Sequence, residues 1–248
     1  MSAWPLPFWI AHRGAGKLAP ENTLAAFRLG AAFGYRAFEC DVKLSGDGVA
    51  MLLHDASLER TTNGSGLAVE HDWNTLSRLD AGSWSGRLYA GEPPASLEAI
   101  ARFCIHNRFA LNIEIKPTPG HESVTGEQVA LAADRLWHDS GLQPLLSSFA
   151  PAALVAARSA VAELPRALLI DKPQPDWFDR AQDLQCVAVV ANYAIWQQPM
   201  IETLHQSNMR ALAYTVNDPA SAQWLSGLGI DGLITDAVDR FPPAADRG

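Results

Sequence analysis

The chain has 248 residues, 48% of them hydrophobic and 19% charged, so it can bury a large core and general disorder is excluded. The formal net charge of −8 at pH 7 disfavours nucleic acid and anionic lipid surfaces as partners. A secretory leader is not recognisable and no apolar stretch approaches the roughly 20 residues of a membrane span, so we expect a soluble, cytoplasmic protein without membrane insertion.

Short apolar runs alternate with amphipathic stretches along the chain, which is typical of repeated βα units around a parallel sheet. Strands are predicted at 8–11, 37–42, 110–115, 144–148, 166–170, 186–190, 211–216 and 232–235. Helical spacing is predicted at 21–33, 97–107, 126–140, 151–161, 175–183, 199–207 and 219–228. Eight strands separated by helices predict a single domain over residues 1–248, an α/β fold of the (β/α)8 TIM-barrel type.

The segment between His54 and Ser96 interrupts this alternation. It contains the turn-rich runs 60–66 and 80–86, which indicate loops and short turns rather than a barrel helix. We therefore predict a small insertion at about 56–96, after the second strand. An insertion there would lie over the face on which barrel enzymes build their active sites.

Polar side chains cluster where the predicted strands end, the position of active sites in such barrels. They are, in chain order, His12 and Arg13, Glu39 and Asp41, His54, and Glu114 and Lys116. Alternate residues of a strand point to one face, so each Glu-x-Asp or Glu-x-Lys pair shares a side. Alone, such a pair usually indicates a solvated face, and a lone histidine usually packs in the core. Their joint placement at strand ends favours a functional site.

Three inward carboxylates would repel one another unless a cation lay among them. Mg²⁺ or Ca²⁺, with Mn²⁺ as a third choice, prefers such oxygen ligands. With a divalent ion bound, Arg13 and Lys116 would turn the pocket positive enough to attract a phosphodiester anion. The three cysteines lack zinc-site spacing and lie in apolar runs, so we expect reduced core residues at positions 40, 104 and 186.

The order of several short motifs resembles the glycerophosphodiester phosphodiesterases. They are His12-Arg13-Gly14, Pro20-Glu21-Asn22-Thr23, Glu39-x-Asp41, His54-Asp55, Arg60-Thr61-Thr62-Asn63-Gly64, Glu114-x-Lys116, Ser148-Phe149, Tyr214-Thr215-Val216-Asn217 and Thr235-Asp236. The resemblance covers nearly the whole chain and is closest to the shorter cytoplasmic bacterial members. Tyr214 stands where the family often has tryptophan.

The resemblance implies a metal held by Glu39, Asp41 and Glu114. It also implies an acid/base pair formed by His12 and His54, with Arg13 and Lys116 on the phosphate oxygens. The implied reaction converts small glycerophosphodiesters, such as glycerophosphocholine or glycerophosphoethanolamine, to sn-glycerol 3-phosphate and an alcohol, in lipid and glycerol metabolism. Which histidine is the acid stays open, as does the choice between attack by water and attack by the glycerol 2-hydroxyl.

The substrate pocket is predicted to include Phe149 and Tyr214, and Trp84 and Trp196 are weaker aromatic candidates. Two alternatives remain. A barrel phospholipase of the phosphatidylinositol or sphingomyelinase D type would act on lipid surfaces, but the chain shows no amphipathic helix with a basic face. A non-catalytic barrel that binds phosphodiesters is disfavoured because both histidines are present. The preferred alcohol, the metal and the oligomeric state are left open.

Overall fold

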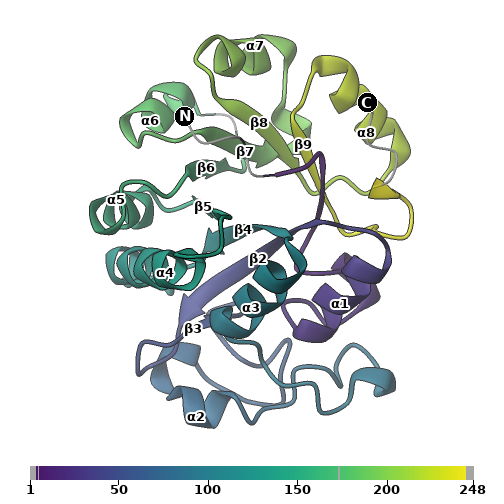
Figure 1. The fold of residues 1–248 in the computed structure, drawn as a ribbon, viewed down its shortest axis with the longest axis vertical. Coiled ribbons are helices and arrows are strands. Elements are labelled where there is room, and N and C mark those ends of the chain that lie inside the picture. The colour runs from purple at the N-terminus through teal and green to yellow at the C-terminus, as the bar shows by residue number, and fades with distance from the viewer. Residues whose placement is uncertain (1–3, 5, 173, 244–248) are drawn as a thin grey trace.

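The computed structural model describes residues 4, 6–172 and 174–243, and eight parallel strands form its centre (Figure 1). β1 pairs with both β2 and β9, so the sheet closes into a barrel. The barrel strands are β1 (Trp9–Ala11), β2 (Ala37–Leu44), β4 (Ala110–Ile115), β5 (Leu145–Ser148), β6 (Arg166–Ile170), β7 (Ala188–Asn192), β8 (Arg210–Tyr214) and β9 (Gly232–Thr235). This confirms the (β/α)8 prediction, with the sixth barrel strand, β7, two residues later than predicted.

The structure adds one strand that the sequence did not predict. β3 (Ala50–Leu52) pairs antiparallel with the end of β2, after a tight turn that contains Gly48. Gly48 has a φ of +83°, a conformation that glycine adopts without a steric penalty. The strand has only three residues, too few for an alternating pattern to be recognised in the sequence.

Helices surround the barrel (Figure 1). They are α1 (Leu24–Ala32), α3 (Leu97–Asn107), α4 (Glu122–Trp137), α5 (Pro151–Ala160), α6 (Trp177–Asp183), α7 (Gln198–Gln206) and α8 (Pro219–Leu228). The first begins three residues later than predicted because Thr23 caps it, accepting a hydrogen bond from the amide of Ala26. α4 begins four residues earlier than predicted. This helix includes Gly126, where only glycine fits, because a Cβ would collide with the backbone of Ala153 in α5.

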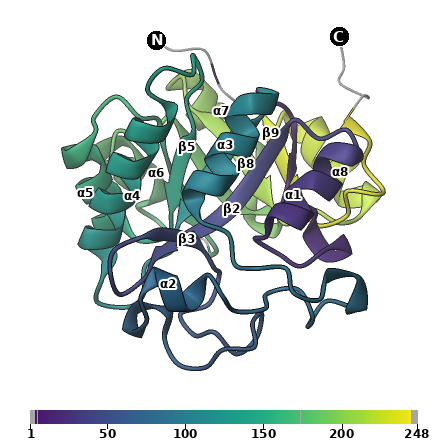
Figure 2. The ribbon, with the colours of Figure 1, turned by 60° about the horizontal axis from the view of Figure 1, so that its bottom comes forward.

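The segment between β3 and α3 folds into loops with three short helices. These are η2 (Ala68–Glu70), α2 (Trp73–Leu76) and η3 (Arg87–Tyr89). Met51, Leu53, Leu58, Ala68 and Leu76 form a small core of its own. Figure 2 shows the segment gathered at one end of the barrel, beside β3. Loops and short turns were expected here, and this is what the structure shows.

The barrel interior changes from apolar to polar along the strands. Ala37 of β2 belongs to an interior cluster with Ile10, Leu145, Val190 and Leu212. Because side chains alternate along a strand, the same side of β2 next presents Glu39, Asp41 and Lys43. The apolar half holds the barrel together, and the polar half opens toward the carboxyl ends of the strands.

Two further expectations concern thiols and membranes. Cys40, Cys104 and Cys186 are all buried and free, as expected for reduced core residues. Within the described residues, every helix is too short or too polar to cross a lipid bilayer.

Candidate active site

Three buried carboxylates occupy the polar half of the barrel. Glu39 and Asp41 come from β2, and Glu114 of β4 is the direct register partner of Asp41. One oxygen from each residue lies within 4.8 Å of the other two. Among the described residues, Glu39 Oε1 and Asp41 Oδ1 find no hydrogen-bond partner although both are buried. Buried carboxylate oxygens left unpaired around a common centre fit a hard divalent cation.

The three carboxylates differ in their proton affinity. Burial and the nearby Asp41 raise the pKa of Glu39, and the same two causes raise the pKa of Glu114 to about 7. Burial would also raise the pKa of Asp41, but the charges of Arg13 and Lys116 outweigh it and lower that pKa to about 2. Asp41 is therefore the most acidic of the three, and the two glutamates lose their protons at a higher pH than an exposed glutamate does.

Two cationic side chains reach the carboxylates from opposite sides. Arg13 Nε lies 3.2 Å from Asp41 Oδ2, and its Nη1 donates to Glu21. Lys116 Nζ donates to Glu114 Oε1 at 2.7 Å and lies 3.5 Å from Asp41 Oδ1. Both cations are only partly exposed, so solvent screens their charge weakly. Arg13 and Lys116 can hold an anion beside the acidic centre once a bound cation neutralises the charge of the carboxylates.

His12 is held by an aspartate at the end of the last strand. Its Nδ1 lies 2.6 Å from Asp236 Oδ1, which directs Nε2 toward the carboxylates, 3.7 Å from Glu39 Oε2. Asn217 donates to the other oxygen of Asp236 and accepts from its backbone amide. Gly16 permits the close approach, because a Cβ at this position would overlap the backbone of Asp236. An aspartate on Nδ1 fixes the ring orientation and makes Nε2 the acceptor nitrogen, which takes a hydrogen bond from Arg13 Nε at 3.2 Å.

His54 carries a similar partner. Its Nδ1 lies 2.7 Å from Asp55 Oδ1, and Arg60 of the inserted segment donates to both oxygens of that aspartate. Arg60 also donates to both oxygens of Glu21, which in turn accepts from Arg13. Burial lowers the pKa of His54 below its usual value. The inserted segment therefore reaches the site through Arg60 and helps to orient His54.

The four aromatic candidates lie in three different environments. Phe149 and Tyr214 pack edge to face, 5.9 Å between ring centroids, and Lys116 Nζ lies 5.5 Å from the centre of the Phe149 ring. Trp196 is buried, with its indole N–H donating to the carbonyl of Leu212, so its prediction as a pocket residue is wrong. Trp84 lies in the inserted segment with 45% of its surface exposed.

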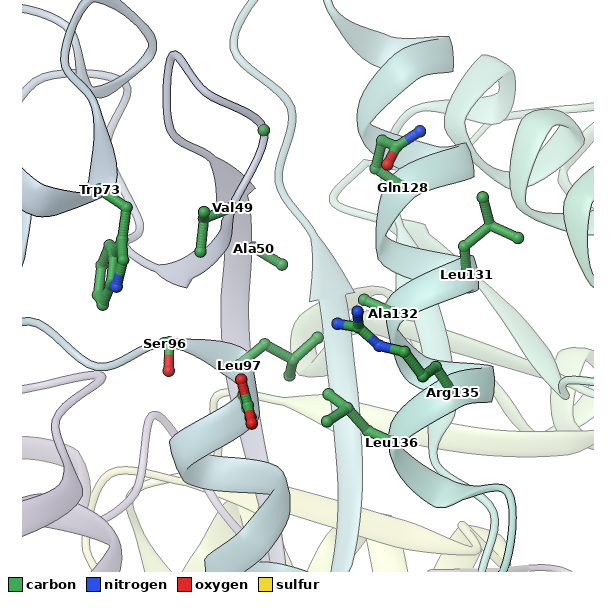
Figure 3. A pocket seen from close by; sticks show the side chains of 12 residues that line it. Val49, Ala50, Trp73, Ser96, Leu97, Gln128, Leu131, Ala132, Arg135 and Leu136 are labelled. Carbon is green, nitrogen blue, oxygen red and sulfur yellow. The ribbon is translucent and has the colours of Figure 1, made fainter.

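A cleft of about 510 Å³ lies outside the barrel, away from these residues (Figure 3). Trp73 and Val49 line one side of it, and Leu131 and Arg135 of α4 line the other. None of the candidate site residues contributes to its walls. The polar end of the barrel, rather than this cleft, brings together the groups that can perform chemistry.

Sequence reasoning gave no role to several residues that the structure brings to the site. Glu21 and Asn22 lie in the turn before α1, where Asn22 donates to Asp41 Oδ2 at 2.8 Å. Arg60 and Asp236 support the histidines, and Lys43 lies beside the acidic centre. Glu21, Asn22, Arg60 and Asp236 stand within the short motifs of the sequence, which was the available signal. Lys43 could have been found from the alternation that also carries Glu39 and Asp41.

Every candidate for acid/base, metal and phosphate contact thus meets at one end of the barrel. A diester of phosphoric acid needs its anionic oxygens neutralised and two protons moved, and this set of side chains provides for both. The fold and the site together define a phosphoric diester hydrolase.

The comparisons give the family. The chain belongs to the glycerophosphoryl diester phosphodiesterase family, whose model matches residues 12–240. A Bacillus subtilis relative is 33% identical over 235 residues, which cover 93% of this chain and 94% of the relative. A Caldanaerobacter subterraneus glycerophosphodiester phosphodiesterase is 28% identical over 227 residues, 92% of this chain and 93% of its own.

One solved structure is especially informative. An Oleispira antarctica phosphodiesterase, determined in complex with the product sn-glycerol 3-phosphate, is 32% identical and superposes with a TM-score of 0.89 over 98% of both chains. A glycerophosphodiester phosphodiesterase from Agrobacterium tumefaciens, at 24% identity and a TM-score of 0.79, shares the fold over 97% of this chain and 100% of its own. The predicted family resemblance is confirmed.

Proposed function

We propose that this enzyme hydrolyses small glycerophosphodiesters to sn-glycerol 3-phosphate and an alcohol, with the aid of one divalent cation. The observation that carries the proposal is the acidic centre of Glu39, Asp41 and Glu114, flanked by His12 and His54. The product-bound Oleispira relative supports the substrate class. Mg²⁺ or Ca²⁺ suits the all-oxygen donor set, with Mn²⁺ as an alternative.

The residues present fit such an ion. Glu39, Asp41 and Glu114 would hold it, and one buried oxygen of each of the first two has no hydrogen-bond partner among the described residues. A bound divalent cation supplies electrostatic stabilisation of the phosphoryl oxygens and favours the ionised form of any oxygen it binds. With it, the charges of Arg13 and Lys116 give the centre a net attraction for a monoanionic diester.

Arg13 and Lys116 are proposed to bind the non-bridging phosphate oxygens. In the described structure both are paired to carboxylates, Arg13 to Glu21 and Lys116 to Glu114. Both donors are preorganised by these contacts, so little reorganisation is needed when charge develops on the phosphoryl group. The guanidinium of Arg13 can offer two parallel N–H donors to one phosphate.

His12 and His54 are proposed to transfer the two protons. In each ring Nδ1 contacts an aspartate, so Nε2 is the nitrogen proposed to exchange a proton with the substrate. In His12 this nitrogen accepts a hydrogen bond from Arg13 Nε at 3.2 Å. One Nε2 accepts the proton of the attacking hydroxyl, and the other donates to the leaving alcohol. Two nucleophiles fit this geometry, a water molecule or the glycerol 2-hydroxyl, and the second would give a cyclic phosphate that is hydrolysed in a later step.

Asp236→Asn should lower kcat by about 10- to 100-fold, because an amide no longer fixes the proton of His12 on Nδ1. The matched control is Asp231→Asn. Asp231 contacts His205 at 2.8 Å, the same kind of pair, but precedes β9 at the opposite end of the barrel. Steady-state kinetics should show the loss only for Asp236→Asn. Equal losses in both variants would contradict an orienting role.

The glycerol side of the substrate is proposed to be held tightly against Phe149 and Tyr214, and the leaving alcohol loosely. Diesters lacking the glycerol 1-hydroxyl should lose about 10²-fold or more in kcat/KM, because buried polar groups would stay unpaired. Exchanging choline for ethanolamine or glycerol should change kcat/KM far less. Strong discrimination among alcohols, with indifference to the missing hydroxyl, would contradict this assignment of the pocket.

Two variants locate that pocket. Phe149→Ala should raise KM, because the ring is proposed to contact the glycerol and lies beside the ammonium of Lys116, the proposed phosphate-binding group. Phe33→Ala is the matched control, since Phe33 also has 40% of its surface exposed but lies at the end of α1.

A diester without the glycerol 2-hydroxyl separates the two nucleophiles. Direct attack by water tolerates the absence of this hydroxyl, and attack through a cyclic phosphate does not.

The remaining proposals concern the whole protein. We propose one phosphodiesterase domain over residues 1–248, with an insertion at about 56–96, that acts in the cytoplasm on small dissolved substrates in lipid and glycerol metabolism. The match of the family to residues 12–240 supports the extent of the domain. Separation of the cell into soluble and membrane fractions tests the location.

A further inference from the structure

Lys43 is a buried lysine at the acidic end of the barrel that the reaction as proposed does not use. It lies on β2, two residues after Asp41, and only 1% of its surface is exposed. The structure gives its ammonium two acceptors, the backbone carbonyls of His54 at 3.2 Å and of Lys116 at 3.1 Å. Among the described residues, no carboxylate oxygen lies within salt-bridge distance, 4.0 Å, of its nitrogen.

These two carbonyls lie where the neighbouring strands leave β2. Leu52 of β3 and Ile115 of β4 both pair with Val42. Beyond that pair, one backbone hydrogen bond continues on each side, from Leu53 N to the carbonyl of Asp41 and from Lys116 N to the carbonyl of Val42. Lys116 makes the last of these bonds and its own carbonyl follows, and His54 is the residue after Leu53. The Lys43 ammonium meets them at the point where sheet pairing ends.

We propose that Lys43 is a positioning residue that bridges the two catalytic segments, fixing the backbone of His54 relative to that of Lys116. The proposal rests on the proposed function, in which His54 transfers a proton and Lys116 binds phosphate. His54 and Lys116 lie just beyond the residues of β3 and β4 that pair with β2. One ammonium that binds both carbonyls sets the separation of the proton-transfer group and the phosphate-binding group.

A simpler account is that Lys43 only fills space in the barrel. An apolar side chain of the same length would fill that space without the cost of burying a charge that lacks an ion-pair partner. The carbonyl of His54 and that of Lys116 could then bind water at the mouth. The bridge, unlike mere packing, requires donors at the end of the side chain, and this difference can be measured.

The test replaces the donors and keeps the stem. Lys43→Met should lower kcat/KM for glycerophosphocholine by roughly 10- to 100-fold, the usual effect of a displacement of about 1 Å at a reacting group. Arg102→Met removes an exposed cation of α3, away from the site, and is the control, with activity unchanged. Lys43→Gln, which keeps a polar end on a shorter side chain, repeats the test if Lys43→Met does not fold. Circular dichroism confirms that each variant is folded.

A double-mutant cycle separates positioning from packing. If Lys43 acts through His54, the loss caused by Lys43→Met should shrink at least fivefold when His54 is already alanine, because the group it positions is absent. If Lys43→Met lowers kcat/KM by the same factor in the His54→Ala protein as in the wild type, the proposal is overturned. So would near-wild-type activity in both Lys43→Met and Lys43→Gln.

A measurement on the protein without substrate keeps this test apart from the proposed function. The ring nitrogen signals of His54 in ¹⁵N-labelled protein, identified by their loss in His54→Ala, should shift in Lys43→Met and stay unchanged in Arg102→Met. Unshifted His54 signals would overturn the proposal. A wild-type protein that hydrolyses no glycerophosphodiester would overturn the proposed function instead, and the ring signals would still decide whether Lys43 positions His54.

Discussion

Removal of divalent cations should abolish turnover of glycerophosphodiesters, and Mg²⁺, Mn²⁺ or Ca²⁺ should restore it. The physical reason is the acidic centre, in which Glu39, Asp41 and Glu114 come within 4.8 Å of one another. Without a cation, the negative charge of this centre opposes binding of a phosphodiester anion. Activity is measured after prolonged dialysis against chelator and again after each metal is added back.

The same centre predicts how cation binding depends on pH. Burial and Asp41 raise the pKa of Glu114 to about 7 in the cation-free protein, so a cation must displace a proton below that pH. The affinity for Mg²⁺, measured by titration calorimetry, should weaken as the pH falls from about 8 to 6. Affinity that is constant over this range, or full activity in excess chelator, would contradict a cation bound at these carboxylates.

His12→Ala and His54→Ala should each lose about 10²- to 10⁴-fold in kcat, the usual effect of removing a positioned proton-transfer group. Both rings sit at the acidic end of the barrel with an aspartate on Nδ1. The fold should survive, because neither ring belongs to the apolar clusters that hold the barrel together. Kinetics with an unactivated diester measures the loss, and circular dichroism checks the fold.

His106→Ala is the matched control for these two variants. His106 is an exposed residue of α3, so its replacement should leave kcat within about twofold. A substrate with a good leaving group assigns the roles, because it needs no acid: the variant whose loss shrinks most has lost the general acid. If either His12→Ala or His54→Ala keeps near-wild-type turnover, that histidine is structural.

The barrel was predictable because its signal repeats. Each strand is a short apolar run, and Pro or capping residues open many of the helices, so local errors of two to four residues left the eightfold alternation intact. β3 escaped prediction because three residues paired at an edge leave no periodic pattern. The later start of the first helix is set by the side chain of Thr23, a choice that propensity alone does not reveal.

The candidate site was predictable where strand alternation placed residues on one face, as with Glu39, Asp41 and Glu114. The supporting contacts were not, because they join segments far apart in sequence. Asp236 reaches His12 across 224 positions, and Arg60 reaches Glu21 across 39. Trp196 shows the opposite error: its position near a strand end suggested a pocket, but its indole N–H is satisfied inside the core.

The most direct test of the account is an assay of the purified protein, supplied with Mg²⁺, Ca²⁺ or Mn²⁺, against a panel of glycerophosphodiesters. Glycerophosphocholine, glycerophosphoethanolamine and glycerophosphoglycerol are each incubated with the protein, and sn-glycerol 3-phosphate is measured by an enzyme-coupled assay. The account predicts cation-dependent release of sn-glycerol 3-phosphate that is lost in His12→Ala. Failure to release it from every member of the panel with all three metals, while the protein is folded, would contradict the account.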